Sequence, residues 1–174
     1  MKKITLTIIF ALTALVFIIP FSSFSYEKSD YTYEIIDNKA IVTGFEGKPV
    51  FIDIPAIIDG CHVTEIRDNA FYECDTLRHI TLPETIEKIG HHSFYACFSL
   101  ESIVIPESVT EIGMGCFCGC SALSSVSLSK NITKIPESCF RSCTSLKSIV
   151  ISDNITEISD FCFSGCTELS SVSV

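Results

Sequence analysis

Apolar residues recur along most of this chain at a fixed spacing of 23 residues. Six apolar columns keep that register through five successive units, in the pattern I-x-x-x-[small]-F-x-x-C-x-x-L-x-x-I-x-L. The phenylalanine column consists of Phe71, Phe94, Phe117, Phe140 and Phe163. Because one such unit cannot bury its own apolar row, the pattern predicts stacked units that share a continuous core.

Two short elements are expected in each unit. The alternation in I-x-L, as in Ile80–Leu82, indicates a short parallel strand. The stretch that holds the phenylalanine and the cysteine, as in Ala70–Cys74, is predicted to form a single helical or 3₁₀ turn on the opposite side. A 23-residue unit with one strand and one turn lies within the leucine-rich-repeat range. The expected fold is an α/β solenoid, rich in β structure, whose strands line a leucine-rich-repeat arc.

The N-terminal part of the chain departs from the repeat. Tyr31–Ile36 and Ala40–Phe45 are β-rich runs on either side of a turn signal at Asp37–Lys39, and they predict a hairpin. After the first strand of the repeats, about five extra residues near Ala56–Gly60 are expected to form a surface loop. Terminal units that differ from the repeat in this way are typical caps.

The pattern F-x-x-C-x-x-L-x-x-I-x-[LI]-P, present in Phe71–Pro83 and Phe94–Pro106, resembles the BspA-like leucine-rich repeats of bacterial surface proteins. The segment Tyr33–Ile66 is also similar to the start of those domains, so the likeness covers nearly the whole mature chain. Later units depart from it, because Ser129 and Ser152 stand in place of the proline. The resemblance implies a secreted or surface-attached protein. Several members of that family are implicated in adhesion and in binding host proteins, and the likeness implies no catalytic residues.

The N-terminus has the composition of a secretion signal. Two lysines precede the uninterrupted apolar and threonine run Ile4–Ile19, and small residues precede Tyr26, where we expect cleavage. The alternative is a membrane anchor, but sixteen residues are short for a span of about 20. We therefore expect a secreted or cell-surface protein with no membrane insertion after cleavage. The chain divides into a signal peptide over residues 1–25, a β cap over residues 26–51, and leucine-rich repeats over residues 52–174, about five units of which the last is incomplete.

The net charge narrows the range of partners. The chain has 12 basic and 21 acidic residues, a formal charge of −9. Nucleic acid and anionic lipid need Lys and Arg to meet phosphate, so both are disfavoured as partners.

The ten cysteines could form disulfides in an exported protein. All except Cys61 and Cys118 fall in two columns of the repeat, where a small apolar side chain fits a tight inner turn. Stacked turns about 4.8 Å apart remain within the Cα range of a disulfide, so bridges along a column stay open as an alternative. We expect mostly reduced, structural thiols.

Isolated motifs give no sign of catalysis or of a metal site. Cys116–Cys120 carries three thiols, but the repeat explains two of them and no matching second pair exists. His91 and His92 have no partner four residues away and are interpreted as a solvated pair. A nucleophile signature such as G-x-S-x-G is absent. The sequence predicts no catalytic, metal-binding or cofactor-binding residue, and therefore no enzyme.

One polar column alternates in sign: Glu65, Lys88, Glu111, Lys134 and Glu157. Stacked one unit apart, each charge would lie beside charges of the opposite sign. Such alternation suits cross-strand pairing and penalises a slipped register. We interpret the column as a device that holds the register.

The residues that alternate with the strand core are expected to form a concave binding face: His79, Thr81, Ser102, Val104, Ser125, Ser127, Ser148, Val150, Ser171 and Ser173. This face is rich in hydroxyls and nearly uncharged, so a protein or glycan ligand bound weakly or by avidity fits it best. The predicted function is protein–protein or adhesive interaction. The alternative is a structural, self-assembling segment of a longer surface protein, with end-to-end contact through the C-terminal repeat.

Overall fold

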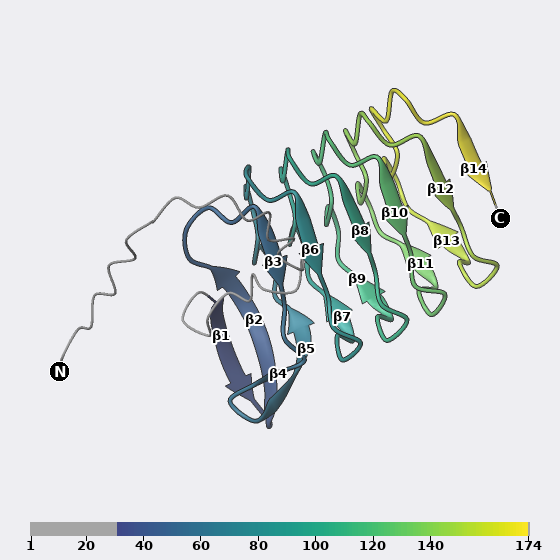
Figure 1. Cartoon of the computed structure of the whole chain (residues 1–174). Helices are drawn as coiled ribbons and strands as arrows, with labels where there is room; N and C mark the ends of the chain where they lie inside the picture. The colour runs from purple at the N-terminus through teal and green to yellow at the C-terminus, as the bar shows by residue number, and fades with distance from the viewer. Residues whose placement is uncertain (1–30, 174) are drawn as a thin grey trace, which may run out of the picture.

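A computed structural model describes residues 31–173 of the chain, and the predicted signal peptide lies outside this range. Successive units stack along one axis as a β-solenoid (Figure 1). Residues 31–173 form strands and turns and contain no helix. Within that range, therefore, no helix has the length and apolar character needed to cross a bilayer.

The expected parallel strands are present, one in each unit. They are β3 (Phe51–Asp53), β6 (His79–Thr81), β8 (Ser102–Val104), β10 (Ser125–Ser127), β12 (Ser148–Val150) and β14 (Ser171–Ser173). β3, β6, β8 and β10 form one parallel ladder, and β12 pairs in parallel with β14. Figure 1 shows the six strands side by side along the solenoid. The middle residue of each strand belongs to the predicted apolar column, as Ile80 and Ile103 do.

Each unit also contributes a second strand, which the sequence pattern did not predict. This second row consists of β5 (Cys61–Ile66), β7 (Lys88–Ile89), β9 (Glu111–Ile112), β11 (Lys134–Ile135) and β13 (Glu157–Ile158). Four of these strands are only two residues long, which is too short for alternation to reveal them. They carry the alternating charge column, so those side chains lie on two parallel ladders, β5-β7-β9 and β11-β13.

The N-terminal hairpin forms as expected. β1 (Tyr31–Ile36) pairs antiparallel with β2 (Lys39–Phe45) through a turn at Asp37 and Asn38, both of which have positive φ. β2 then pairs in parallel with β5, so the hairpin extends the second row of strands.

The inserted residues were expected to form a plain surface loop, and that expectation is wrong. They form the strand β4 (Ile57–Ile58), which pairs antiparallel with β5 around Asp59 and Gly60. The side chain of Ile58 is buried in the core. Burial of this apolar side chain keeps the insertion against the solenoid.

The helical or 3₁₀ turn expected in each unit does not form, because two residues per unit have left-handed backbone. The first column is Asn69, His92, Gly115, Ser138 and Phe161, and the second is Glu73, Ala96, Gly119, Ser142 and Gly165. Alternate amides donate to the next unit, as Phe71 does to the carbonyl of Ser93 at 2.8 Å. The amides between them close local turns, as Tyr72 does with Asn69 at 3.1 Å. These turns are therefore bonded to one another along the stack, as strands are.

The core consists of side-chain columns that run the length of the stack. Neighbouring rings of the phenylalanine column are parallel, with centroids 5.3–5.7 Å apart and planes within 9°. Phe71, Phe94, Phe117 and Phe140 are almost completely buried. Isoleucines of the strands and leucines of the segments beside them pack around this column and form one continuous core.

The second row of strands is interrupted between β9 and β11, which are not hydrogen-bonded partners. In the other units the residue after the strand donates its amide to the preceding unit. Gly90 donates to Ile66 at 2.8 Å, and Gly113 donates to Ile89 at 2.8 Å. Pro136 occupies this position in the next unit and has no backbone N–H to donate. The proline therefore removes one bond that would join β11 to β9. The bond equivalent to that from Thr156 to Thr133 is also missing between Thr133 and Thr110.

Candidate binding surfaces

The structure places the ten residues of the predicted binding face on one row of strands. They flank the central residue of β6, β8, β10, β12 and β14, and every one of them is exposed or half-exposed. Residue pairs such as Ser102 and Ser125 lie directly opposite each other in the parallel ladder. We call this surface the strand face. Binding to it remains a prediction.

Two further residues, Phe51 and Asp53 on β3, extend the strand face at its N-terminal end. The ring of Phe51 stacks on His79 with centroids 5.3 Å apart and planes 14° apart. Both residues were missed from the sequence because the face was counted only from His79 onward. The alternation around Ile52 was the signal that could have placed them there.

Charged side chains beside the strand face lie near the same N-terminal end. Arg78 forms an ion pair with Glu101 at 2.8 Å, and the Nε2 atom of His79 lies 3.6 Å from the same carboxylate. Further along the stack the face consists of serine hydroxyls and two valines, Val104 and Val150, each about two-thirds exposed. The face therefore changes from aromatic and charged to small and weakly polar.

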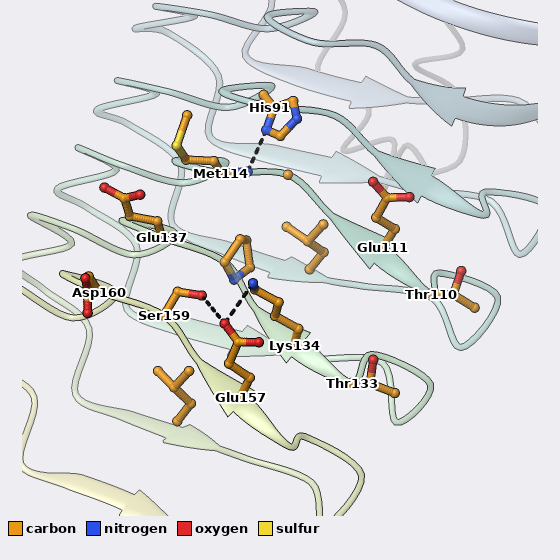
Figure 2. Close-up of a pocket in the computed structure, with 14 residues that line it drawn as sticks. His91, Thr110, Glu111, Met114, Thr133, Lys134, Glu137, Glu157, Ser159 and Asp160 are labelled. Carbon is orange, nitrogen blue, oxygen red and sulfur yellow. Dashed lines mark hydrogen bonds and ion pairs between the residues drawn. The ribbon is translucent and has the colours of Figure 1, made fainter.

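A groove of about 710 Å³ lies over the second row of strands, at the place where β9 and β11 are not paired (Figure 2). Inside it, the carboxylate of Glu157 accepts hydrogen bonds from Lys134 at 2.7 Å and from the Ser159 hydroxyl at 3.1 Å. The bond from Lys134, followed by that from Ser159, holds the pKa of Glu157 below its ordinary value. At the upper end of Figure 2, His91 accepts the backbone N–H of Met114 through Nδ1 at 2.9 Å.

The alternating charge column is divided by the same interruption. Lys88 pairs with Glu111 at 3.8 Å, and Lys134 pairs with Glu157 at 2.7 Å. Glu65 and Lys88 are neighbours in the ladder register. The two ion pairs join opposite charges between adjacent units, whereas Glu111 and Lys134 lie on strands that are not paired, and the effect on register remains a prediction.

The structure does not bring the candidate chemical residues together. Cys116 and Cys120 are buried in the core, whereas Cys118 points away from it and is half-exposed. His91 bonds to Met114, whereas His92 lies edge-on to a tyrosine ring. Among the described residues no group of three His, Cys, Asp or Glu side chains is placed to hold a metal ion.

Known proteins with the same repeat confirm the fold. The family model described as a BspA type leucine rich repeat region matches residues 62–174 in six copies. A leucine rich repeat protein of T. pallidum is 32% identical, with a TM-score of 0.80. The match covers 83% of this chain and 68% of that protein. No curated protein sequence matches.

Two other solved structures are similar over the same region. A leucine rich cell surface protein from Faecalibacterium prausnitzii A2-165 is 26% identical over 84% of this chain and 53% of its own, with a TM-score of 0.53. A leucine-rich repeat protein from Eubacterium ventriosum ATCC 27560 is 25% identical over 83% of this chain and 40% of its own, with a TM-score of 0.71. The chain thus spans about half the length, or less, of these two proteins.

Proposed function

Because the chain belongs to the family of BspA-type leucine-rich repeat proteins, we propose that it is a secreted or cell-surface protein that binds other macromolecules. The ligand is a protein or a glycan, held on the strand face. The solenoid is a typical non-enzymatic scaffold, and the proposal assigns no catalytic role.

One observation carries this proposal: the strand face is an outward surface of six parallel strands, which form a ladder of four (β3, β6, β8 and β10) and a further pair (β12 and β14). At one end of this face Phe51 stacks on His79, and the strands further along the stack expose serine hydroxyls. An aromatic anchor beside many small polar groups suits a broad contact of modest affinity, strengthened by avidity. The similarity to the leucine rich cell surface protein of Faecalibacterium prausnitzii A2-165 supports the location.

An array of purified extracellular-matrix proteins and glycans tests the binding proposal, with residues 26–174 as the probe. The variant Ser125→Glu with Ser148→Glu places two charges on the strand face. The matched control, Thr110→Glu with Thr133→Glu, places them at exposed positions that directly precede β9 and β11, on the groove side of the second row of strands and away from the strand face. We expect at least one ligand whose binding the first variant abolishes and the control retains. Equal binding by both variants would argue against the strand face.

Export is tested separately. We expect the protein recovered from the medium or the cell surface of a bacterial host to begin at Tyr26. N-terminal sequencing and intact mass give the answer directly. Retention of residues 1–25 in a membrane fraction would instead support the anchor alternative.

A further inference from the structure

The residue that follows each core phenylalanine points away from the core and forms a column along the turns: Tyr72, Tyr95, Cys118, Arg141 and Ser164. The first two side chains are stacked, with ring centroids 4.9 Å apart and planes 5° apart. The distance between neighbouring units along this column therefore matches the spacing of stacked aromatic rings. The next step, at Cys118, has no ring.

The place of the missing ring is a hollow of about 390 Å³, lined among others by Tyr95, Cys118 and Arg141. The two left-handed positions of this unit are both glycines, Gly115 and Gly119, at φ 60° and 80°. Three outward positions of one unit thus carry almost no side chain. Tyr95 and Arg141 lie on the two sides of the hollow, two repeats apart, or roughly 10 Å by strand spacing.

The walls of this hollow are held in position by their neighbours. His92 meets the Tyr95 ring edge-on, with centroids 5.7 Å apart and planes 71° apart. A Cβ atom at Gly115 would lie only 2.6 Å from Cδ2 of His92, so glycine is needed for the imidazole to lie there. On the other side, desolvation raises the pKa of Cys118, and the positive charge of Arg141 partly offsets that rise. The positive charge of Arg141 therefore acts at the Cys118 thiol, which lines the hollow.

We propose that this hollow binds a planar aromatic side chain of a partner polypeptide, seated over Cys118 between Tyr95 and Arg141. One face of that ring continues the Tyr72–Tyr95 stack. The other face carries the negative quadrupole of a π system and meets the positive guanidinium. A pyranose ring has no such π face, so the charge arrangement favours the aromatic occupant. This site, the Cys118 slot, is separate from the strand face and does not depend on its function.

Titration of ¹⁵N-labelled protein with N-acetyl-tryptophan amide, followed by NMR, tests the proposal. We expect saturable shifts at the backbone amides of Tyr95, Cys118, Gly119 and Arg141. N-acetyl-leucine amide serves as the non-aromatic probe and is expected to leave these signals in place. Equal shifts from the two amides, or no saturable shift from the aromatic one, would overturn the proposal.

Variants in the same column sharpen the test. Cys118→Tyr fills the slot with the protein's own ring and is expected to abolish the shifts. Ser164→Tyr adds the same ring beyond Arg141, leaves the slot open, and is expected to retain them. Arg141→Ala is expected to weaken binding about two- to five-fold. Retained binding in Cys118→Tyr would overturn the proposal, and so would methyl β-glucoside binding at the slot in place of the aromatic amide.

Discussion

The thiol of Cys143 lies 3.1 Å from the carbonyl oxygen of Phe117, 26 residues earlier, and donates a hydrogen bond to it. Cys97, Cys120 and Cys166 repeat this contact with the phenylalanine of the unit before. The cysteine column is therefore more than a set of small side chains. Each of these carbonyl oxygens already accepts a backbone N–H of its own unit, and the thiol adds a second hydrogen bond from the next unit, which an alanine could not do.

Thiol counting is the first prediction. In the native protein we expect Ellman's reagent to react slowly with the buried thiols and faster with the half-exposed Cys118, because buried structural thiols are inert. In denaturant without reductant, close to the full set of ten cysteines should react. A thiol count that rises by eight or more after reduction would reveal four or more disulfides. It would contradict the expectation that the thiols are mostly reduced and structural.

Alkaline destabilisation is the second prediction. Desolvation raises the pKa of Cys162 to about 12 and lifts the pKa of Cys116, Cys120 and Cys139 well above the ordinary value of 9.0. Above pH 9 the unfolded chain loses these protons and the folded chain keeps them. The free energy of unfolding is then fully present below pH 9 and falls at higher pH, by about 1.4 kcal/mol per pH unit for each fully buried thiol.

Urea unfolding between pH 7 and pH 10.5 measures this dependence. We expect a flat profile up to about pH 8.5, followed by a steep fall. Cys139→Ala should lower the stability at pH 7 but flatten the fall, because one titrating thiol is gone. A profile that stays flat to pH 10.5 would show that the buried thiols do not control alkaline stability.

Close packing at Gly113 is the basis of the third prediction. A Cβ atom there would lie 2.3 Å from the backbone nitrogen of His91 and 2.5 Å from the carbonyl carbon of Gly90. Since both contacts are with backbone, Gly113→Ala should force the two units apart and lower the free energy of unfolding by about 1–3 kcal/mol or more. The exposed neighbour variant Met114→Ala should change it little. Thermal unfolding of the two variants compares the sites, and equal melting temperatures would refute the packing argument.

The fourth prediction concerns the interrupted ladder. Pro136→Ala restores an amide donor at the position where Gly113 bonds to Ile89, without adding an atom beyond the Cβ already present. We expect the new amide to be protected from hydrogen exchange, because it can reach the carbonyl of Ile112. Net stability should change by less than about 1 kcal/mol, since the greater freedom of the unfolded chain offsets the bond. If the amide introduced by Pro136→Ala exchanges like an exposed one, the gap does not depend on the proline.

The fifth prediction concerns the ion pair in the groove of Figure 2. Lys134→Gln removes the main cause of the lowered pKa of Glu157, so that pKa should rise toward its ordinary value. The lowered pKa means that the pair stabilises the fold above the unfolded pKa of Glu, and that this contribution is lost as pH falls through the folded value. Carboxyl-carbon NMR titration measures the shift. Lys88→Gln is the control, and an unchanged Glu157 titration in both variants would contradict the pairing.

Most of the architecture was predictable because the period is long and repeated. Five phenylalanines lie 23 residues apart, from Phe71 to Phe163, and a stacked solenoid buries them together in one core. The strands at Ile80 and its equivalents followed from alternation. The strand face followed from those strands, except for Phe51 and Asp53, because the face was counted only from His79 onward.

The features that the sequence did not predict correctly all depend on contacts between neighbouring units. A stretch such as Ala70–Cys74 has the composition of a helical turn, but its alternate amides find acceptors in the next unit. Residues with left-handed backbone, such as Asn69 and Glu73, occur in the turns that bond to the next unit. Their residue types do not identify these turns in the sequence. The two-residue strands of the second row have no local signal at all.

The amino-acid sequence by itself determined the period, the core columns and the family, because each depends on which side chains recur at the same spacing. Only the tertiary structure decided how neighbouring units bond to one another. It showed that the second row of strands is interrupted beside Pro136, that Cys143 donates to a carbonyl oxygen of the preceding unit, and that Cys118 leaves a hollow between Tyr95 and Arg141. The reason is physical: these features depend on groups that lie roughly 20 or more residues apart and meet only when the turns are stacked.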